Sequence, residues 1–204
     1  MADLADKFVS ELTRVVGSDS IGTETNYLGI DINGNLTVSL VDGNKATYSA
    51  TITNLPSTAL ASDIFTLTGS ATKTIRITRV ALSGIQTTGA QVSIIFLRRS
   101  TANTGGTSTS LAAISMDTNN PAATATGLVY TANATVGTLV GNIRTRKVSV
   151  SASSGASDAL ILDFGTRNSQ AVVLRGINQV FAVNLNNVTV AGSSFNISIE
   201  WTEE

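Results

Sequence analysis

The sequence predicts an all-β protein: an antiparallel sandwich of the jelly-roll type with about eight strands, preceded by an N-terminal helix and a small β-meander arm. A third of the 204 residues are Thr, Ser or Asn. The β-branched side chains among them favour strands, whereas Asn and Ser favour turns. Short alternating apolar segments follow one another from residue 63 onward without intervening helical patterns. This spacing is typical of a sandwich or a barrel.

Residues 1–26 are expected to form an amphipathic helix and a polar joint. Apolar side chains recur at helical spacing within residues 2–16, and Gly17 is a natural helix end. The apolar stripe consists of Leu4, Phe8, Leu12, Val15 and Val16. A helix of about 15 residues is only marginally stable alone in water. The stripe therefore needs a surface, either on its own domain, in a bundle of copies or on another protein.

Residues 27–62 are expected to form an attachment arm, a hairpin meander followed by a connector. Asn33-Gly34 and Asp42-Gly43 separate alternating apolar segments. Such dipeptides favour type I′ turns, because both central residues need a positive φ. The meander would span residues 27–53, and residues 54–62 would connect it to the sandwich.

Residues 63–204 are expected to form the β-sandwich domain. The final strand has the clearest alternation, with one apolar face made of Phe195, Ile197, Ile199 and Trp201. Residues 91–98 are apolar enough for a central strand, and residues 100–110 are rich in Thr, Ser and Gly and predict a long loop. About eight strands in two sheets favour a jelly roll over an immunoglobulin-like sandwich.

The composition argues against catalysis. The chain has no His and no Cys, which excludes Ser-His-Asp and Cys-His catalysis, His or Cys metal sites and disulfides. Glycosidases use facing carboxylates, usually in a cleft with aromatic side chains, and the chain has few aromatic residues. Asp31, Asn33 and Asn35 resemble the start of a calcium loop, but the required Gly and the final Glu are missing. We expect no enzymatic activity, no cofactor and no metal.

The charge is unevenly divided, with a net −4 in residues 1–62 and +3 in residues 63–204. The basic candidates for contact are Arg98, Arg99, Arg144, Arg146 and Lys147. These residues either occupy outward strand positions paired with acids or contact an acidic neighbour. The basic excess is mild and lacks stacking aromatics, so we expect no specific nucleic-acid binding.

Membrane insertion is not expected from the sequence. The longest apolar runs are far shorter than the roughly 20 residues that cross a bilayer. The N-terminus is acidic and lacks the basic start of a signal peptide. We therefore expect synthesis in a cytoplasm without a secretion signal.

Four stretches resemble structural proteins of tailed bacteriophages: residues 63–79, 98–106, 163–171 and 188–203. The resemblance covers roughly residues 63–203. It implies a virion component, made in the cytoplasm of the bacterial host, whose partner is the major capsid protein or another virion protein. Cement proteins often act as trimers, so a homotrimer is expected.

Two functions are compatible with this resemblance. The first is a capsid cement or decoration protein that binds and stabilises the head shell. The alternative is a head fibre, tail spike or receptor-binding appendage, with a host-surface site on loops such as residues 100–110 or 117–126. A free-standing lectin-like module or enzyme is a third, less favoured hypothesis. Copy number per particle separates the first two functions.

Overall fold

The computed structural model describes residues 29–30, 36–37, 45–56, 63–152, 157–165, 170–187 and 190–204. The chain divides into two compact units, residues 1–44 and 45–204. In the first unit, β1 (Gly29–Ile30) pairs antiparallel with β2 (Leu36–Thr37), and the predicted turns at Asn33-Gly34 and Asp42-Gly43 lie outside the described residues. The predicted helix and its stripe of Leu4, Phe8, Leu12, Val15 and Val16 lie outside the described residues.

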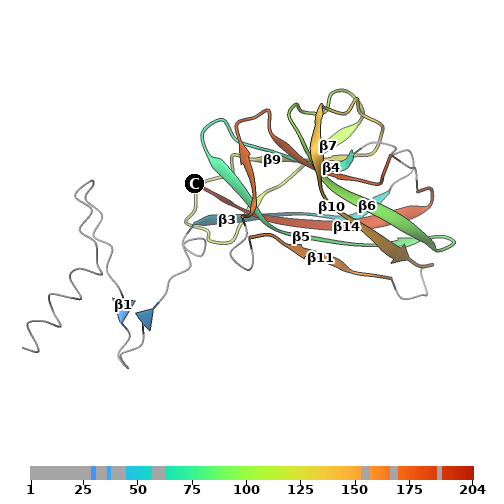
Figure 1. The fold of residues 1–204 in the computed structure, drawn as a ribbon, viewed down its shortest axis with the longest axis horizontal. Helices are drawn as coiled ribbons and strands as arrows, with labels where there is room; N and C mark the ends of the chain where they lie inside the picture. Colours follow the sequence, from blue (N-terminus) through green and yellow to red (C-terminus); the bar gives the residue numbers. More distant parts are fainter. Residues whose placement is uncertain are drawn as a thin grey trace, which may run out of the picture. The chain divides into compact units, whose positions relative to one another are not determined.

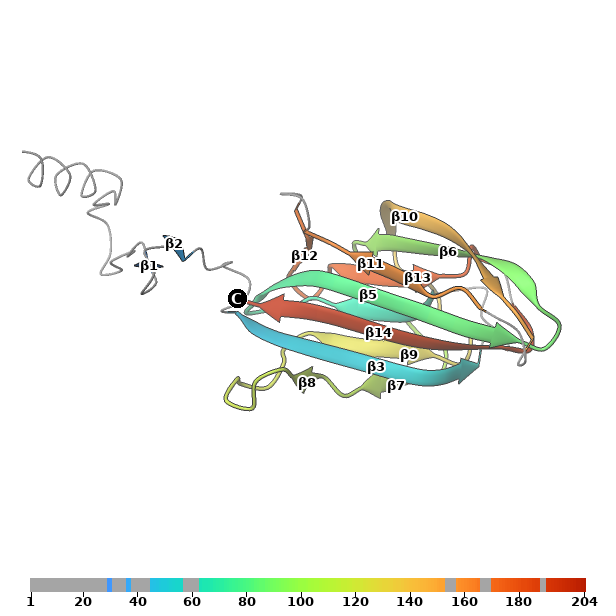
Figure 2. The same ribbon diagram turned by 90° about the horizontal axis from the view of Figure 1, so that it is seen from below.

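The described part of the second unit consists of strands in two antiparallel sheets (Figures 1 and 2). The β5/β14 sheet has the spatial order β11 (Leu160–Asp163), β5 (Thr74–Gln86), β14 (Ser193–Glu203), β3 (Ala46–Pro56) and β8 (Ile114–Ser115), and β12 (Val172–Arg175) also pairs with β5. The β6/β13 sheet has the order β10 (Leu139–Val150), β6 (Ala90–Arg99), β13 (Val180–Asn184), β4 (Asp63–Thr68), β9 (Thr126–Tyr130) and β7 (Ser108–Leu111). The predicted all-β sandwich is confirmed at this level.

The pairings in this unit are nested. β3 pairs with β14, β4 with β13, β5 with both β11 and β12, and β6 with β10. The first strand of the unit therefore pairs with the last. Each following strand pairs with a strand that lies earlier in the sequence than the partner of the strand before it. The remaining strands, β7 to β9, come from the long connection between β6 and β10 and extend both sheets at their margins.

The predicted start of the sandwich at residue 63 is corrected to residue 45. β3 lies inside the β5/β14 sheet, between β14 and β8, rather than in a local meander, because its apolar face is buried beside the C-terminal strand. Tyr48 is opposite Trp201, and their rings stack with centroids 5.9 Å apart. The hairpin signal at Asp42-Gly43 predicted a neighbour in sequence, whereas the partner that buries Tyr48 is about 150 residues away.

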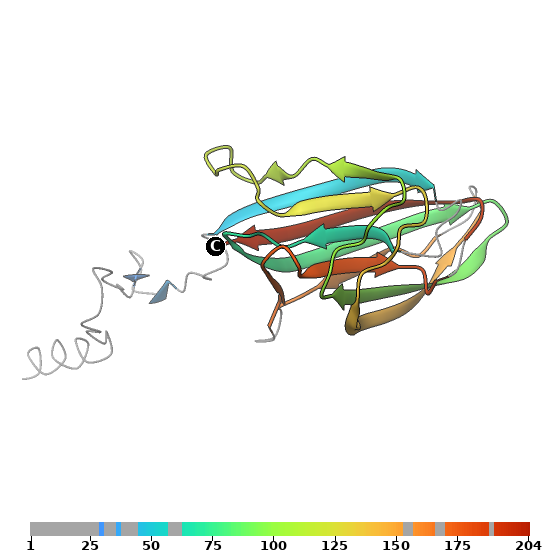
Figure 3. The ribbon, with the colours of Figure 1, turned by 90° about the horizontal axis from the view of Figure 1, so that it is seen from above.

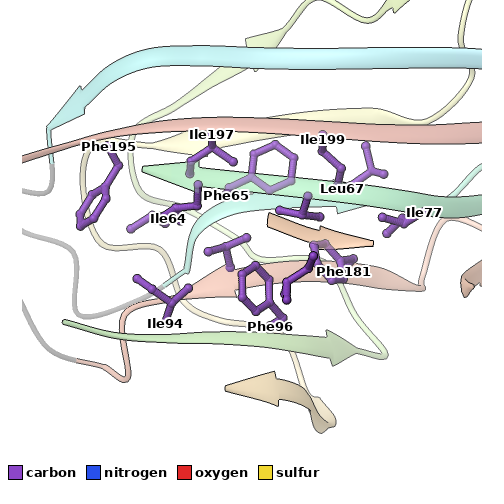
Figure 4. Close-up of a cluster of buried hydrophobic side chains, with 14 of the residues drawn as sticks. Ile64, Phe65, Leu67, Ile77, Ile94, Phe96, Phe181, Phe195, Ile197 and Ile199 are labelled. Atoms are coloured by element: carbon purple, nitrogen blue, oxygen red, sulfur yellow. The ribbon is translucent and has the colours of Figure 1, made fainter. Parts of the chain in front are cut away.

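The hydrophobic core lies between the two sheets (Figure 4). Phe96 and Phe181 stack at 6.2 Å between centroids, and Phe164 meets Phe181 edge-on at 6.2 Å. The face predicted for the last strand is confirmed, because Phe195, Ile197, Ile199 and Trp201 are all buried. Each such side chain contributes roughly 1.5–3 kcal/mol on burial, so this core is the main source of stability.

The connection between β6 and β10 covers the outward face of the β6/β13 sheet. Leu97, Ala182 and Thr66 lie in one outward row of this sheet, yet all three are buried. In Figure 3 the green-to-yellow trace of the connection runs across the sheet. Residues 100–110, predicted as a long loop, overlap β7, and Asn103 in this segment is hydrogen-bonded to the sheet beneath it.

Candidate interaction surfaces

A buried ion pair ties the covering connection to the sheet beneath it. Asp63 is fully buried and Arg99 is 5% exposed. Arg99 donates to both carboxylate oxygens, from Nε at 2.6 Å and from Nη2 at 2.7 Å. The amides of Asn103 and Asn184 each donate a further hydrogen bond to Asp63 at 2.9 Å. Arg99 also donates to the carbonyl of Gly137 at 2.8 Å. The candidate Arg99 is therefore a structural residue, and its assignment to an interaction surface is corrected.

A second buried carboxylate, Glu203, holds the middle of the same connection. It accepts hydrogen bonds from the backbone amides of Thr124 and Ala125, from the Thr124 hydroxyl and from Nε1 of Trp201. Burial opposes ionisation of Glu203, but these donors outweigh it and hold the pKa below its usual value. Burial, together with the negative charge of Glu203, raises the pKa of Tyr48, whose hydroxyl donates to the carbonyl of Pro121.

Arg98, the neighbouring basic candidate, is half-buried. Its Nη2 donates to Oε1 of Gln179 at 2.9 Å, in the turn that precedes β13. The same oxygen accepts from the backbone amide of Arg175 at 2.8 Å. Arg98 therefore braces this turn. Arg99 is neutralised by Asp63, whereas Arg98 is held by the neutral side chain of Gln179.

The remaining basic candidates lie together on β10, the strand at one edge of the β6/β13 sheet, and all are exposed. We call Arg144, Arg146 and Lys147 the basic edge. Arg144 pairs with Phe96 and Arg146 with Ile94, and both of these partners are buried, so the two arginines lie on the core side of the sheet. The guanidinium of Arg144 is 5.7 Å from the centroid of the Phe164 ring, in cation–π range. Figures 2 and 3 show β10 at the outer margin of the sandwich.

Exposed apolar side chains precede the basic edge. Leu139 and Val140, at the start of β10, are 54% and 62% exposed, and Val136 just before them is also exposed. The carbonyl of Gly137, within this segment, is held by Arg99. Exposed apolar residues that lie close together beside a sheet edge are typical of a contact surface.

Two open hollows lie elsewhere on the second unit. One, of about 410 Å³, lies over the β5/β14 sheet, where Ile161, Ala81 and Ser198 share a row. The other, of about 330 Å³, is lined in part by the amide side chains of Gln86 and Gln91. Within the described residues, no cluster of three metal-ligating side chains occurs, and no helix is long and apolar enough to span a bilayer.

The sequence reasoning missed both buried carboxylates. For Glu203 a signal was present, because it continues the inward alternation of Ile199 and Trp201 by one step. An acid at a core-facing position must find donors, and the nearby connection supplies them. For Asp63 the sequence carries no such signal, because its partner Arg99 is in a different strand.

Comparison with known proteins gave no match: no family model, no curated protein and no solved structure is significantly similar to this chain.

Proposed function

We propose that the chain is a structural component of a bacteriophage virion, a cement or decoration protein that binds and stabilises the head shell. The resemblance of residues 63–203 to tailed-phage structural proteins suggests this role. The observation that carries it is that the buried and the exposed charged groups have different roles. The buried carboxylates Asp63 and Glu203 are occupied by hydrogen bonds that hold the fold, whereas the free charges of the basic edge are on the surface. Such a protein is suited to contact rather than to chemistry.

We also propose that the second unit is a jelly roll. In that fold eight strands pair first with eighth, second with seventh, third with sixth and fourth with fifth. If β11 and β12 count as one interrupted strand, the pairs β3–β14, β4–β13, β5–β11/β12 and β6–β10 follow this order. Jelly rolls occur in viral capsid proteins and also in lectins and cupins, so the fold is compatible with the proposed role without requiring it.

The attachment to the shell is assigned to the N-terminal segment, and the assembly is a homotrimer. Deletion of residues 1–26 should abolish association with capsids and leave a folded sandwich. Full association of the truncated protein would contradict this assignment. Light scattering of the full chain at high concentration should give the trimer mass, and a monomer mass would count against assembly before docking.

The experiment that tests the role is a copy-number measurement on purified particles of the phage that encodes this chain. Quantitative mass spectrometry should find hundreds of copies per particle, in a fixed ratio to the major capsid protein. A few dozen copies or fewer would instead favour the alternative of a fibre, spike or receptor-binding appendage. Absence of the chain from particles would overturn both.

One observation favours that alternative. The hollow of about 330 Å³ is lined by Gln86, Gln91 and Asn186, and the buried Oε1 of Gln86 has no hydrogen-bond partner among the described residues. Amide side chains around an open hollow suit a polar ligand such as a host-surface glycan. Specific binding on a glycan array that is lost in Gln91→Ala would support this function.

A further inference from the structure

We propose that the outer edge of β10 is a docking site, at which an extended acidic segment of a partner protein adds as a further strand to the β6/β13 sheet. The partner is defined by its chemistry alone, whether or not it is a virion protein.

The backbone of β10 has hydrogen-bonding groups available on its outer side. Both backbone groups of Ser149 point away from β6: its amide donates to Oδ2 of Asp158 at 2.6 Å, and its carbonyl accepts from the Asp158 amide at 2.9 Å. Because backbone groups alternate in direction along an antiparallel strand, those of Thr145 and Lys147 point the same way. Within the described part of the chain, neither has a backbone partner on that side.

The side chains around these groups select an acidic partner. Arg144 and Arg146 flank Thr145 on the core side of the sheet, and Lys147 lies on the other face. Within the described residues, no carboxylate lies in ion-pair distance of the three. Side chains of an added strand would lie about 4.5–5.5 Å from those of β10, close enough for carboxylates to pair with them.

The same charges argue against pairing between two copies of this edge. If two β10 strands met, basic side chains would face basic side chains, which is unfavourable at cross-strand distance. For an acidic partner strand, the exposed Leu139 and Val140 provide apolar contacts at one end of the edge. The edge thus combines backbone pairing, which gives affinity, with charge, which gives selectivity.

Nucleic acid is the other acidic polymer that a basic strand attracts. Single-stranded nucleic acids bind through stacking of bases on aromatic side chains as well as through charge. All aromatic side chains of the described sandwich are buried. The available backbone groups and the neighbouring apolar residues favour a peptide.

The test uses the full chain and three probes: a capped ten-residue peptide that alternates Glu and Val, the same peptide with Lys for Glu, and a ten-nucleotide oligothymidylate. Binding is measured by fluorescence anisotropy, and hydrogen exchange by mass spectrometry locates the site. We expect the acidic peptide alone to bind and to slow exchange in the segment that contains Thr145 and Lys147. Binding of the oligonucleotide without the acidic peptide would overturn the proposal, as would slowed exchange elsewhere only.

Two variants test the backbone pairing and the charge selectivity of the edge in turn. Thr145→Pro removes an outward N–H without removing a ladder hydrogen bond, a position at which an edge strand tolerates proline. It should weaken binding of the acidic peptide at least tenfold although every charge remains. Unchanged affinity in a folded Thr145→Pro protein would contradict strand addition.

If Thr145→Pro does not fold, the double variant Arg144→Glu, Arg146→Glu tests whether this edge is the site, and slowed exchange of the β10 amides in the parent protein tests the backbone pairing. It should weaken the acidic peptide at least tenfold and allow binding of the Lys-containing peptide. The matched control reverses two exposed charges away from β10, Lys73→Glu with Arg175→Glu, and should change the affinity less than twofold. An equal loss in the control would show that net charge, not this edge, governs binding.

Discussion

Arg99, the last residue of β6, holds Asp63, the first residue of β4, through two hydrogen bonds of 2.6 and 2.7 Å in a site closed to solvent. Asn103 on the covering connection donates to the same carboxylate. The pair therefore joins two sheet strands to the layer above them. Its contribution is structural, because the pair is buried and its hydrogen bonds join these strands to the covering connection.

Removing one member of this pair should lower the unfolding free energy considerably. Asp63→Ala leaves the Arg99 guanidinium buried without its counter-ion, which costs about 3–5 kcal/mol of unfolding free energy. The measurement is urea unfolding followed by the fluorescence of Trp201, the only tryptophan. As a control, Arg79→Ala breaks an exposed ion pair with Asp163 and should cost less than about 1 kcal/mol. Equal costs for the two variants would contradict the assigned role of Asp63.

Stability should fall in acid because of the C-terminal carboxylates. Hydrogen bonds from Lys45 and Arg76 lower the pKa of Glu204, and Glu203 also has a lowered pKa. A carboxyl group with a lower pKa in the folded state stabilises the fold above its unfolded pKa of about 4.3, and this stabilisation is lost as the pH falls through the folded value. We expect the unfolding free energy to be level at neutral pH and to decline below about pH 4.5.

The variant Glu203→Gln distinguishes the contribution of Glu203 to the unfolding free energy from that of Glu204. The Gln amide cannot accept hydrogen bonds from all the donors around Glu203. The unfolding free energy should therefore be about 1–3 kcal/mol lower at pH 7, and it should decline less in acid. Glu204→Gln removes the partly exposed group and should cost less than about 1 kcal/mol. If Glu203→Gln were as stable as the parent at pH 7, the donors around this carboxylate would not stabilise the fold.

The corrected domain boundary predicts where the chain can be cut. A protein of residues 45–204 should unfold cooperatively with a protected core. Residues 63–204 lack β3, which leaves the hydrogen-bonding edge of β14 open and the Trp201 ring without Tyr48, so this shorter protein should not fold stably. Circular dichroism and hydrogen exchange measure both outcomes. A stable fold of residues 63–204 would restore the boundary that the sequence suggested.

The covering connection is tight at Gly137. A Cβ there would lie 1.9 Å from the carbonyl oxygen of Thr101, so Gly137→Ala must displace backbone and should cost about 1–3 kcal/mol or more. Gly141 is a matched control, because nothing lies within 4 Å of a Cβ at that position. Thermal unfolding of both variants gives the comparison. Similar melting temperatures would mean that the connection is not packed as described.

The sequence allowed prediction of those features that depend on local pattern. The alternation of the last strand correctly identified its buried face, and the Thr-rich composition correctly indicated an all-β fold. The position of β3 could not be found in this way, because Tyr48 and Trp201 are brought together only by the nested pairing. The same reason explains Arg99, which becomes buried only once the connection folds over it.

The candidate site was predicted only in part. The sequence singled out Arg144, Arg146 and Lys147 as basic, and the structure places all three on one exposed edge. That β10 is an edge strand follows from the strand order, which no local pattern encodes. The apolar stripe of residues 2–16 and its proposed role in attachment remain predictions, because they lie outside the described residues.

The central claim, that this chain decorates the head shell of a phage, is tested most directly by a cryo-electron microscopy map of the particle that carries it. The account predicts density for the two-sheet unit repeated over the shell and seated where capsomers meet. Density restricted to one vertex or to the tail, or shells without any such density, would contradict it.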